Sequence, residues 1–216
     1  LGLLVRVTLS PWGQAPVPDI LATRLLLAQG TQDPHPVYGT GISTLGGAWK
    51  HLTSLGPTGW FTLQIILACL VPPLIWFITW YLAKKEQKST AALFAGTLAT
   101  LLPVHVLLSA SIVEHVSITT FCVGAMAAWL GSYHHPRMPL GILAGLLAGF
   151  ATHIRPEILP FAGIVGLGLC LGPKQGRLLR VLGAFLCLGL LFWRSIEITE
   201  KEFKIAQRVL VPRRTV

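Results

Sequence analysis

The chain has 216 residues, of which 53% are hydrophobic and 12% are charged, and this charged share is about half that of a typical soluble domain. Its mean hydropathy is +0.67. A single globular core of this length cannot bury so much apolar surface while its exterior stays hydrated, which argues against a soluble enzyme, a disordered chain and a disulfide-bonded secreted domain. The composition therefore predicts an all-α, polytopic transmembrane helical bundle.

Charge and cysteine content fit the same class. The formal net charge is +9, from 17 Lys and Arg against 8 Asp and Glu. The basic residues form short clusters between apolar runs, so we interpret them as topology signals and contacts to anionic lipid headgroups, with no nucleic-acid partner. The four cysteines lie in apolar runs without a CxxC or a His/Cys metal pattern, which is typical of buried thiols: Cys69, Cys122, Cys170 and Cys187.

The first segment, Leu1–Leu9, is apolar apart from Arg6. Nine residues cannot cross a bilayer, and the segment lacks the features of a signal peptide. We interpret it as the end of a membrane helix whose start is missing, so that the true N-terminus is expected upstream.

A long loop, Pro11–Thr58, comes next, and it contains two segments that suit helices lying in the membrane interface. These are the mostly apolar Ile20–Ala28 and the amphipathic Ile42–Leu52. Asp19 immediately precedes the first segment. An Asp at this place is a natural helix N-cap, and a catalytic carboxylate is the alternative that stays open.

Further apolar runs predict about six to seven membrane segments in a domain spanning 1–194, followed by a basic tail, 195–216. The runs are Gly59–Ala83, Thr90–Leu108, Ile112–Gly131, Pro139–Ala151, Ile158–Leu171 and Val181–Trp193. Pro72 and Pro73 should kink the first of these. The fourth and fifth runs are short, and they are either two helices meeting at a polar break or one interrupted element.

Glycines in the fourth run predict close helix packing. Gly141, Gly145 and Gly149 are four residues apart, so a helix would carry them on one face. A face without side chains lets a second backbone approach closely, as is common between membrane helices.

The distribution of Lys and Arg predicts the topology. Seven of them lie in the loops 84–88, 132–138 and 172–180, whereas the alternate loops hold only Arg24, Lys50 and Arg155. Basic loops concentrate on the cytoplasmic side, so 11–58, 109–114 and 153–157 are expected outside. The segment Arg194–Val216 holds six Lys and Arg and does not fit this pattern, so either the last run is re-entrant, or the tail is aberrant or truncated.

Polar groups from three segments are predicted on this outer face, where they could form one site. They are Asp19, the pair Glu114-His115, and the segment containing His153, Arg155 and Glu157. Each has a structural alternative: Glu114 at the water interface, for example, or an Arg155–Glu157 ion pair.

The chemistry of these groups suits group transfer from a lipid phosphate. A carboxylate can act as a general base toward a hydroxyl or amine, and an arginine can bind a phosphate with two hydrogen bonds. The histidines and glutamates are also potential ligands of a divalent metal ion, although their spacing is not diagnostic.

The order of these features resembles a known family. Arg6, the Pro18-Asp19 pair and Glu114 are followed by GILAGLLAGFATHIRPEILPF at residues 141–161. From about Leu1 to Arg194 the chain looks like the N-terminal half of the GT-C polytopic glycosyltransferases, in particular the protein O-mannosyltransferase and aminoarabinose-transferase group. These enzymes take sugars from polyprenyl phosphates.

The resemblance implies a membrane glycosyltransferase that acts on the non-cytoplasmic side of a bacterial inner membrane. It implies that Asp19 is the catalytic carboxylate, that Glu114 is the acidic residue before the fourth helix, and that Arg155 contacts the lipid phosphate, with His153 and Glu157 beside it. The chain departs from the family where Ile20 replaces the second acidic residue of many relatives. Relatives are also usually much longer, which leaves open whether this chain is active alone.

Two rival hypotheses remain. The chain is alternatively a non-catalytic scaffold or accessory subunit, a degenerate or truncated transferase half that packs against another membrane protein through its glycines. A small transporter with 153–157 at the membrane midplane is the third hypothesis, and the lack of an inverted internal repeat counts against it.

Overall fold

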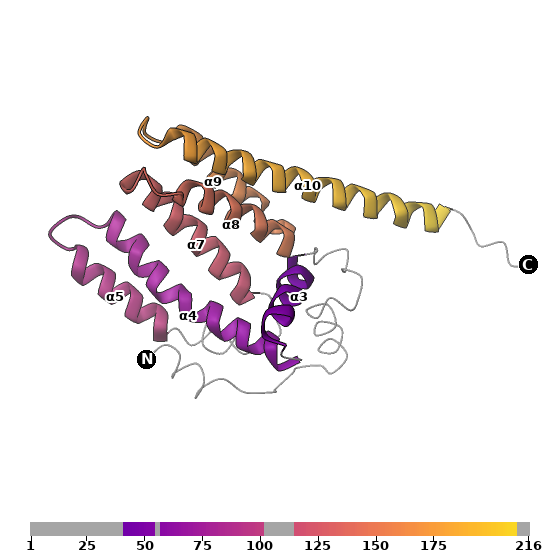
Figure 1. Cartoon of the computed structure of the whole chain (residues 1–216), viewed down its shortest axis with the longest axis horizontal. Helices are drawn as coiled ribbons and strands as arrows, with labels where there is room; N and C mark the ends of the chain where they lie inside the picture. The colour runs from indigo at the N-terminus through magenta and orange to yellow at the C-terminus, as the bar shows by residue number, and fades with distance from the viewer. Residues whose placement is uncertain (1–40, 55–56, 102–114, 211–216) are drawn as a thin grey trace, which may run out of the picture.

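The computed structural model describes residues 41–54, 57–101 and 115–210, and within these ranges it contains seven α-helices, one 3-10 helix and no strand (Figure 1). The helices are α3 (Gly41–Thr53), α4 (Pro57–Leu82), α5 (Lys88–Leu101), α7 (His115–His134), α8 (Leu140–Ile154), η1 (Pro156–Ile158), α9 (Leu159–Leu171) and α10 (Arg177–Leu210). The all-α prediction is therefore confirmed for the described part of the chain. The expected segments 1–9 and 20–28 lie outside it.

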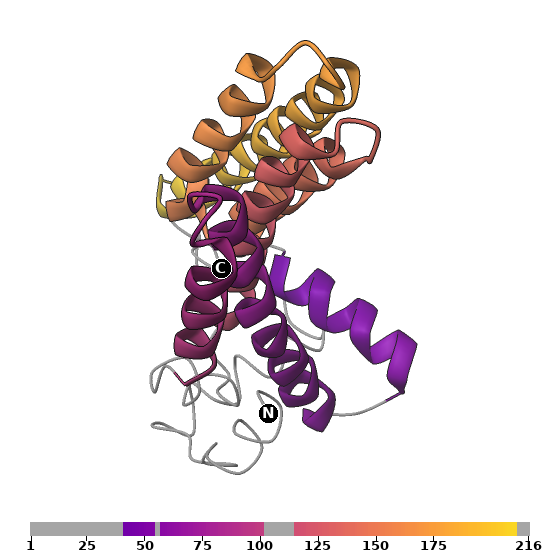
Figure 2. The ribbon, with the colours of Figure 1, turned by 90° about the vertical axis from the view of Figure 1, so that its left-hand side faces the viewer.

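The helices pack side by side in the order α5, α4, α7, α8 and α10, and α9 lies against α8 and α10. α3 contacts α4 and α8, and it lies at an angle to the side of the bundle (Figure 2). The predicted amphipathic helix at 42–52 is thus present as α3.

Two helices are long and apolar enough to cross a membrane, over the ranges Gly59–Leu82 and His115–His134. The segments Leu140–Ile154 and Pro156–Leu171 are apolar but shorter. The described structure therefore supports two candidate spans, and the six to seven expected from the sequence stay a prediction. α4 is assigned as one helix through Pro72 and Pro73.

The polar break after α8 separates two helices. Arg155 has an extended backbone, with φ −143° and ψ 129°, because a residue that precedes proline is disfavoured in the helical region. Beyond the break α9 packs against α8, and Ala148 and Val165 belong to the same buried cluster. This region therefore forms two short helices that meet at a polar break, and the alternative of one interrupted element is wrong.

α10 is longer than the last apolar run predicted. It has 34 residues, which corresponds to about 51 Å at 1.5 Å per residue. Val181–Trp193 forms its first half, and the helix continues through most of the segment expected as a basic tail. In Figure 1 this second half extends beyond the other helices.

The glycine face of α8 packs against α10, as predicted. A Cβ atom on Gly141 would approach Arg180 Cα to 2.8 Å, and one on Gly149 would approach Leu190 Cβ to 2.8 Å. At the centre, a Cβ on Gly145 would overlap the backbone carbonyl of Gly183. We call this row of contacts the glycine seam, and it lets the two helix backbones touch.

Buried polar side chains join α4 to α7. The Gln64 amide nitrogen donates to the Ser117 hydroxyl at 2.8 Å, and the Thr120 hydroxyl donates to the Leu67 carbonyl at 3.0 Å. Each pair is separated by 53 residues, so the two helices run parallel. Hydrogen bonds between buried polar groups hold apolar helices in register.

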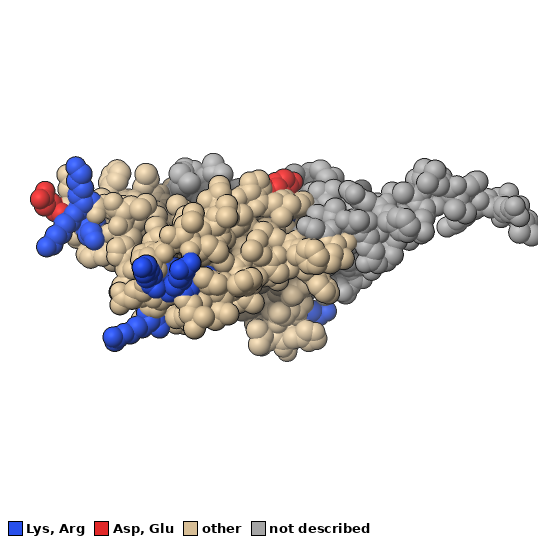
Figure 3. All heavy atoms as spheres, turned by 90° about the horizontal axis from the view of Figure 1, so that it is seen from above, with Lys and Arg blue, Asp and Glu red and all other residues tan. Residues whose placement is uncertain are grey.

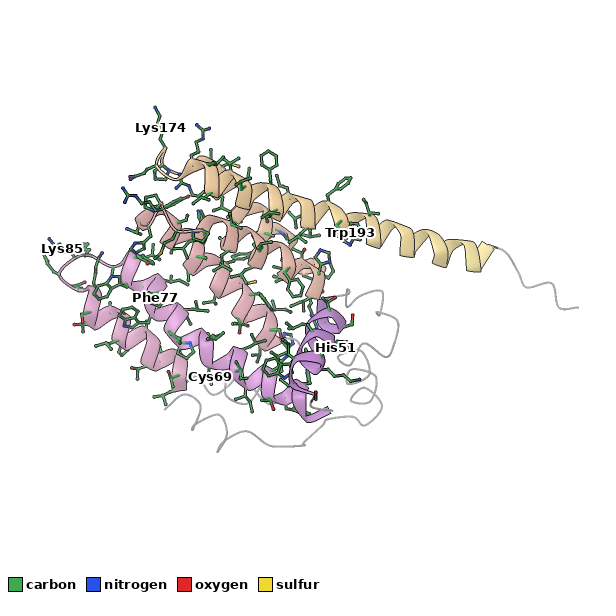
Figure 4. The ribbon with its side chains drawn as sticks, in the orientation of Figure 1. His51, Cys69, Phe77, Lys85, Lys174 and Trp193 are labelled. Atoms are coloured by element: carbon green, nitrogen blue, oxygen red, sulfur yellow. The ribbon has the colours of Figure 1, made fainter. Side chains whose placement is uncertain are left out.

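The two ends of the bundle differ in charge. The connections 83–87, 135–139 and 172–176 lie at one end, and most of the Lys and Arg side chains in Figure 3 gather there. Lys85 and Lys174 mark this end in Figure 4. We call it the basic end, and we call the opposite end, where α8 stops and α7 begins, the Arg155 end.

The glycine seam generates a stability prediction. Replacing Gly145 with alanine should lower the unfolding free energy by about 1–3 kcal/mol, the cost of overpacking a tight contact. Thermal unfolding of the detergent-solubilised protein measures this as a lower Tm.

Gly163 on α9 is the matched control, because nothing lies within 4 Å of a Cβ built there. Gly163→Ala should be neutral or should stabilise the helix by up to about 1 kcal/mol. Equal Tm values for the two alanine variants would show that the seam is not a close contact.

Candidate functional site

Three of the predicted site residues lie at the Arg155 end. His153 is in the last turn of α8, Arg155 is at the break, and Glu157 is in η1. Asp19 and Glu114 lie outside the described residues. The structure therefore places one side of the predicted site, and its pairing with the two carboxylates stays a prediction.

The Arg155 side chain lies at the break after α8, near Glu157, and it is partly exposed. Its Nη1 atom lies 4.0 Å from Oε1 of Glu157, and the two side chains are 24% and 60% exposed. The Arg155–Glu157 ion pair that we considered as an alternative to a site is thus present. An ion pair this exposed contributes little to stability. A guanidinium can bind a phosphate as well as a carboxylate.

His153 joins two helices. It is buried, and its Nε2 atom lies 3.1 Å from the carbonyl oxygen of Leu190 on α10. This contact gives His153 a structural role at the end of the glycine seam. A role toward a substrate or metal stays a prediction.

An apolar cluster of α3, α4, α7 and α8 residues lies beneath the break. Its buried members are Ile42, Trp60, Leu63, Ile118 and Ile154, and Trp49 and Ile158 pack against it. The start of α3 touches the end of α8, because a Cβ on Gly41 would lie 2.7 Å from the backbone nitrogen of Ile154. The predicted interfacial helix is therefore positioned directly beside Arg155.

Two hydrogen-bond donors in this cluster lack an acceptor within the described ranges. They are the buried indole Nε1 atoms of Trp49 and Trp60. An indole nitrogen can only donate, and a buried donor without an acceptor is costly. Both indoles pack in the cluster that contains Ile154, the residue before Arg155.

The described residues bring together no group of three or more His, Cys, Asp or Glu side chains that could hold a metal ion. A divalent metal at the predicted site would therefore need a ligand such as Glu114 or Asp19, from outside these ranges. The metal hypothesis stays untested.

Arg180 departs from its predicted role. It was counted among the basic loop residues that contact lipid headgroups, but its side chain is buried at the start of α10. The guanidinium donates to the backbone carbonyls of Pro173 and Gln175, the latter at 2.8 Å, and lies over the Tyr133 ring at 5.3 Å. Arg180 thus binds carbonyls of the α9–α10 connection, and no local pattern distinguishes it from its exposed neighbours.

The chain matches no protein-family model, no curated protein and no solved structure. The GT-C resemblance therefore depends only on the residues that suggested it. What the structure adds is the placement of Arg155, His153 and Glu157.

Burial of Arg180 generates a second prediction. Arg180→Ala should lower the unfolding free energy by about 1–3 kcal/mol, because it removes a buried side chain and the donors of the Pro173 and Gln175 carbonyls. Arg177→Ala removes the same charge from an exposed position one turn earlier and should change stability by less than about 0.5 kcal/mol. Thermal unfolding in detergent compares them, and equal losses would contradict the buried role.

Proposed function

We propose that the chain is a multi-pass integral membrane protein with its basic end in the cytoplasm. The support is the large apolar side chains exposed on the sides of the bundle, among them Phe77, Phe94, Leu167 and Phe185. Contiguous apolar surface of this kind is unfavourable in water and favourable in lipid. The positive charge at one end agrees with the positive-inside rule.

We further propose that the Arg155 end carries a glycosyltransferase-like site that uses a polyprenyl-phosphate sugar. The observation that carries this proposal is the position of Arg155, which is partly exposed at a helix break next to the apolar cluster of Ile154, Trp49 and Trp60. The two indole nitrogens of this cluster lack acceptors within the described ranges. A guanidinium suits the phosphate, and the indole N–H groups suit hydroxyl or phosphate oxygens.

The proposed reaction needs one base and one anion-binding group. Asp19 removes a proton from the acceptor hydroxyl or amine, and the acceptor oxygen or nitrogen then attacks the anomeric carbon of the sugar. The bond from that carbon to the phosphate oxygen breaks, and polyprenyl phosphate leaves with the electron pair. Arg155 stabilises the negative charge on the leaving phosphate, so the sugar needs no nucleotide carrier.

Two substitutions test the mechanism in membranes containing a polyprenyl-phosphate sugar. Asp19→Asn should lower transfer by about 10²–10⁴-fold, and Arg155→Ala by about 10²-fold. Arg177→Ala is the control, because it removes one exposed arginine at the basic end. Undiminished transfer in both site variants would exclude the mechanism.

Cysteine labelling tests the membrane placement separately. We expect Glu157→Cys to react with a membrane-impermeant maleimide on intact cells, because this exposed residue is at the Arg155 end. Lys85→Cys should react only after permeabilisation. The unmodified chain controls for its four free cysteines, and labelling of both variants from the same side would contradict the topology.

A second function is favoured by a different observation. The glycines of α8 pack against α10 of the same chain, so they do not contact a partner as the scaffold hypothesis expected. The second half of α10, however, extends beyond the other described helices. This arrangement suits an accessory subunit that docks on another membrane protein. Stoichiometric co-purification of a partner, unaffected by Asp19→Asn, would favour this alternative over catalysis.

A further inference from the structure

An apolar groove runs between α4, α7 and α8, and its lining residues Leu67 and Phe121 also pack against the apolar cluster at the Arg155 end. Its volume is about 360 Å³ and its surface is almost entirely carbon. The floor consists of small residues of α7, including Gly124 and Ala127, and the walls include Phe77 of α4 and Leu143 of α8. The small floor residues create the depth, because larger side chains there would fill the space between the helices.

One end of the groove leads to the basic end of the bundle. Tyr81 lines the groove there, and its ring stacks on the ring of His134, with the centroids 4.6 Å apart and the planes 8° apart. Lys84 lies three residues after Tyr81, and Arg137 lies three residues before Leu140, which also lines the groove. Both basic side chains are exposed. Figure 4 labels Lys85, which lies in the same α4–α5 connection as Lys84, and Phe77 on α4.

The groove has the length of a lipid tail. Leu67 and Tyr81 both line it and are 14 residues apart on α4, which corresponds to about 21 Å at 1.5 Å per residue. Half of a bilayer core is about 15 Å thick. A chain in the groove would therefore extend from the basic end past the middle of the membrane.

We infer that the groove binds an acyl chain of an anionic glycerophospholipid from the cytoplasmic leaflet, with the lipid phosphate between Lys84, His134 and Arg137. Apolar grooves take hydrocarbon, and basic pockets between helices on this side bind anionic headgroups. The inference uses the proposed membrane placement, but it does not depend on sugar transfer.

The charge at the basic end argues against a second copy of the chain as the occupant. Two parallel copies in the membrane would bring the same exposed Lys and Arg side chains together, and like charges repel. An anionic headgroup instead neutralises them. Glu86 is the only acidic residue among the described residues of the connections at this end.

Native mass spectrometry of the full chain, released from nanodiscs of equal phosphatidylglycerol and phosphatidylcholine, tests the inference. We expect one retained phosphatidylglycerol, preferred about tenfold over phosphatidylcholine. Lys84→Ala with Arg137→Ala should abolish this preference. Lys174→Ala with Arg177→Ala removes the same two residue types from the α9–α10 connection and the start of α10, and neither α9 nor α10 lines the groove. This double variant should retain the preference.

A second pair of variants tests the groove itself. Leu143→Trp should fill the groove and remove the retained lipid, because Leu143 lines the groove. Leu146→Trp should have no effect, because Leu146 does not line the groove. The two α8 side chains are similarly exposed, Leu143 to 45% and Leu146 to 40%. Equal retention of both lipids, or equal loss of preference in both charge variants, would overturn the inference. So would a dimer that only Leu143→Trp dissociates, since it would assign the groove to a second copy.

The outcome of these lipid-binding experiments is independent of the sugar-transfer proposal. Lipid retention is measured without a sugar donor, so inactive protein can still retain phosphatidylglycerol. Failure of the cysteine labelling would remove the membrane placement that both proposals share, whereas failure of lipid retention alone would remove only the groove assignment.

Discussion

The backbone contact between Gly145 of α8 and Gly183 of α10 is the constraint on which much of the described structure depends. With no side chain at either position, the two helices lie against each other along the glycine seam. This close approach brings His153 within 3.1 Å of the Leu190 carbonyl at one end and Arg180 against Gly141 at the other. One steric condition thus fixes the geometry of both ends of the bundle.

The sequence predicted the features of this arrangement that depend on residues close together in the chain. Apolar runs determine the helices because backbone hydrogen bonds and apolar side chains favour helices wherever water is scarce. The glycine face follows from a spacing of four residues, and the break at Arg155 follows from the proline after it. The charge difference between the ends is also local, because it depends only on which loops hold Lys and Arg.

The remaining features depend on residues far apart in the chain. Arg180 looks like its exposed neighbour Arg177 in sequence, and its burial arises only when Tyr133 and the α9–α10 connection surround it. Gln64 and Ser117 likewise become partners across 53 residues. For the candidate site, the sequence correctly predicted that α3 exists, but its contact with the end of α8 required the fold. Asp19 and Glu114 stay predictions, since they lie outside the described residues.

The two ends use positive charge in different ways, and this difference links the proposed activities. At the basic end the exposed Lys84 and Arg137 lie close in sequence to the lining residues Tyr81 and Leu140, and flexible cations of this kind suit mobile, interchangeable anions such as lipid headgroups. At the Arg155 end, Arg155 lies at a proline-linked break next to the apolar cluster that contains Ile154, Trp49 and Trp60. Positioned donors lose less entropy when they bind, so they can orient one phosphate for reaction. The two proposals together assign bulk lipid to one end and a reactive lipid to the other, and this division of the charges suits both.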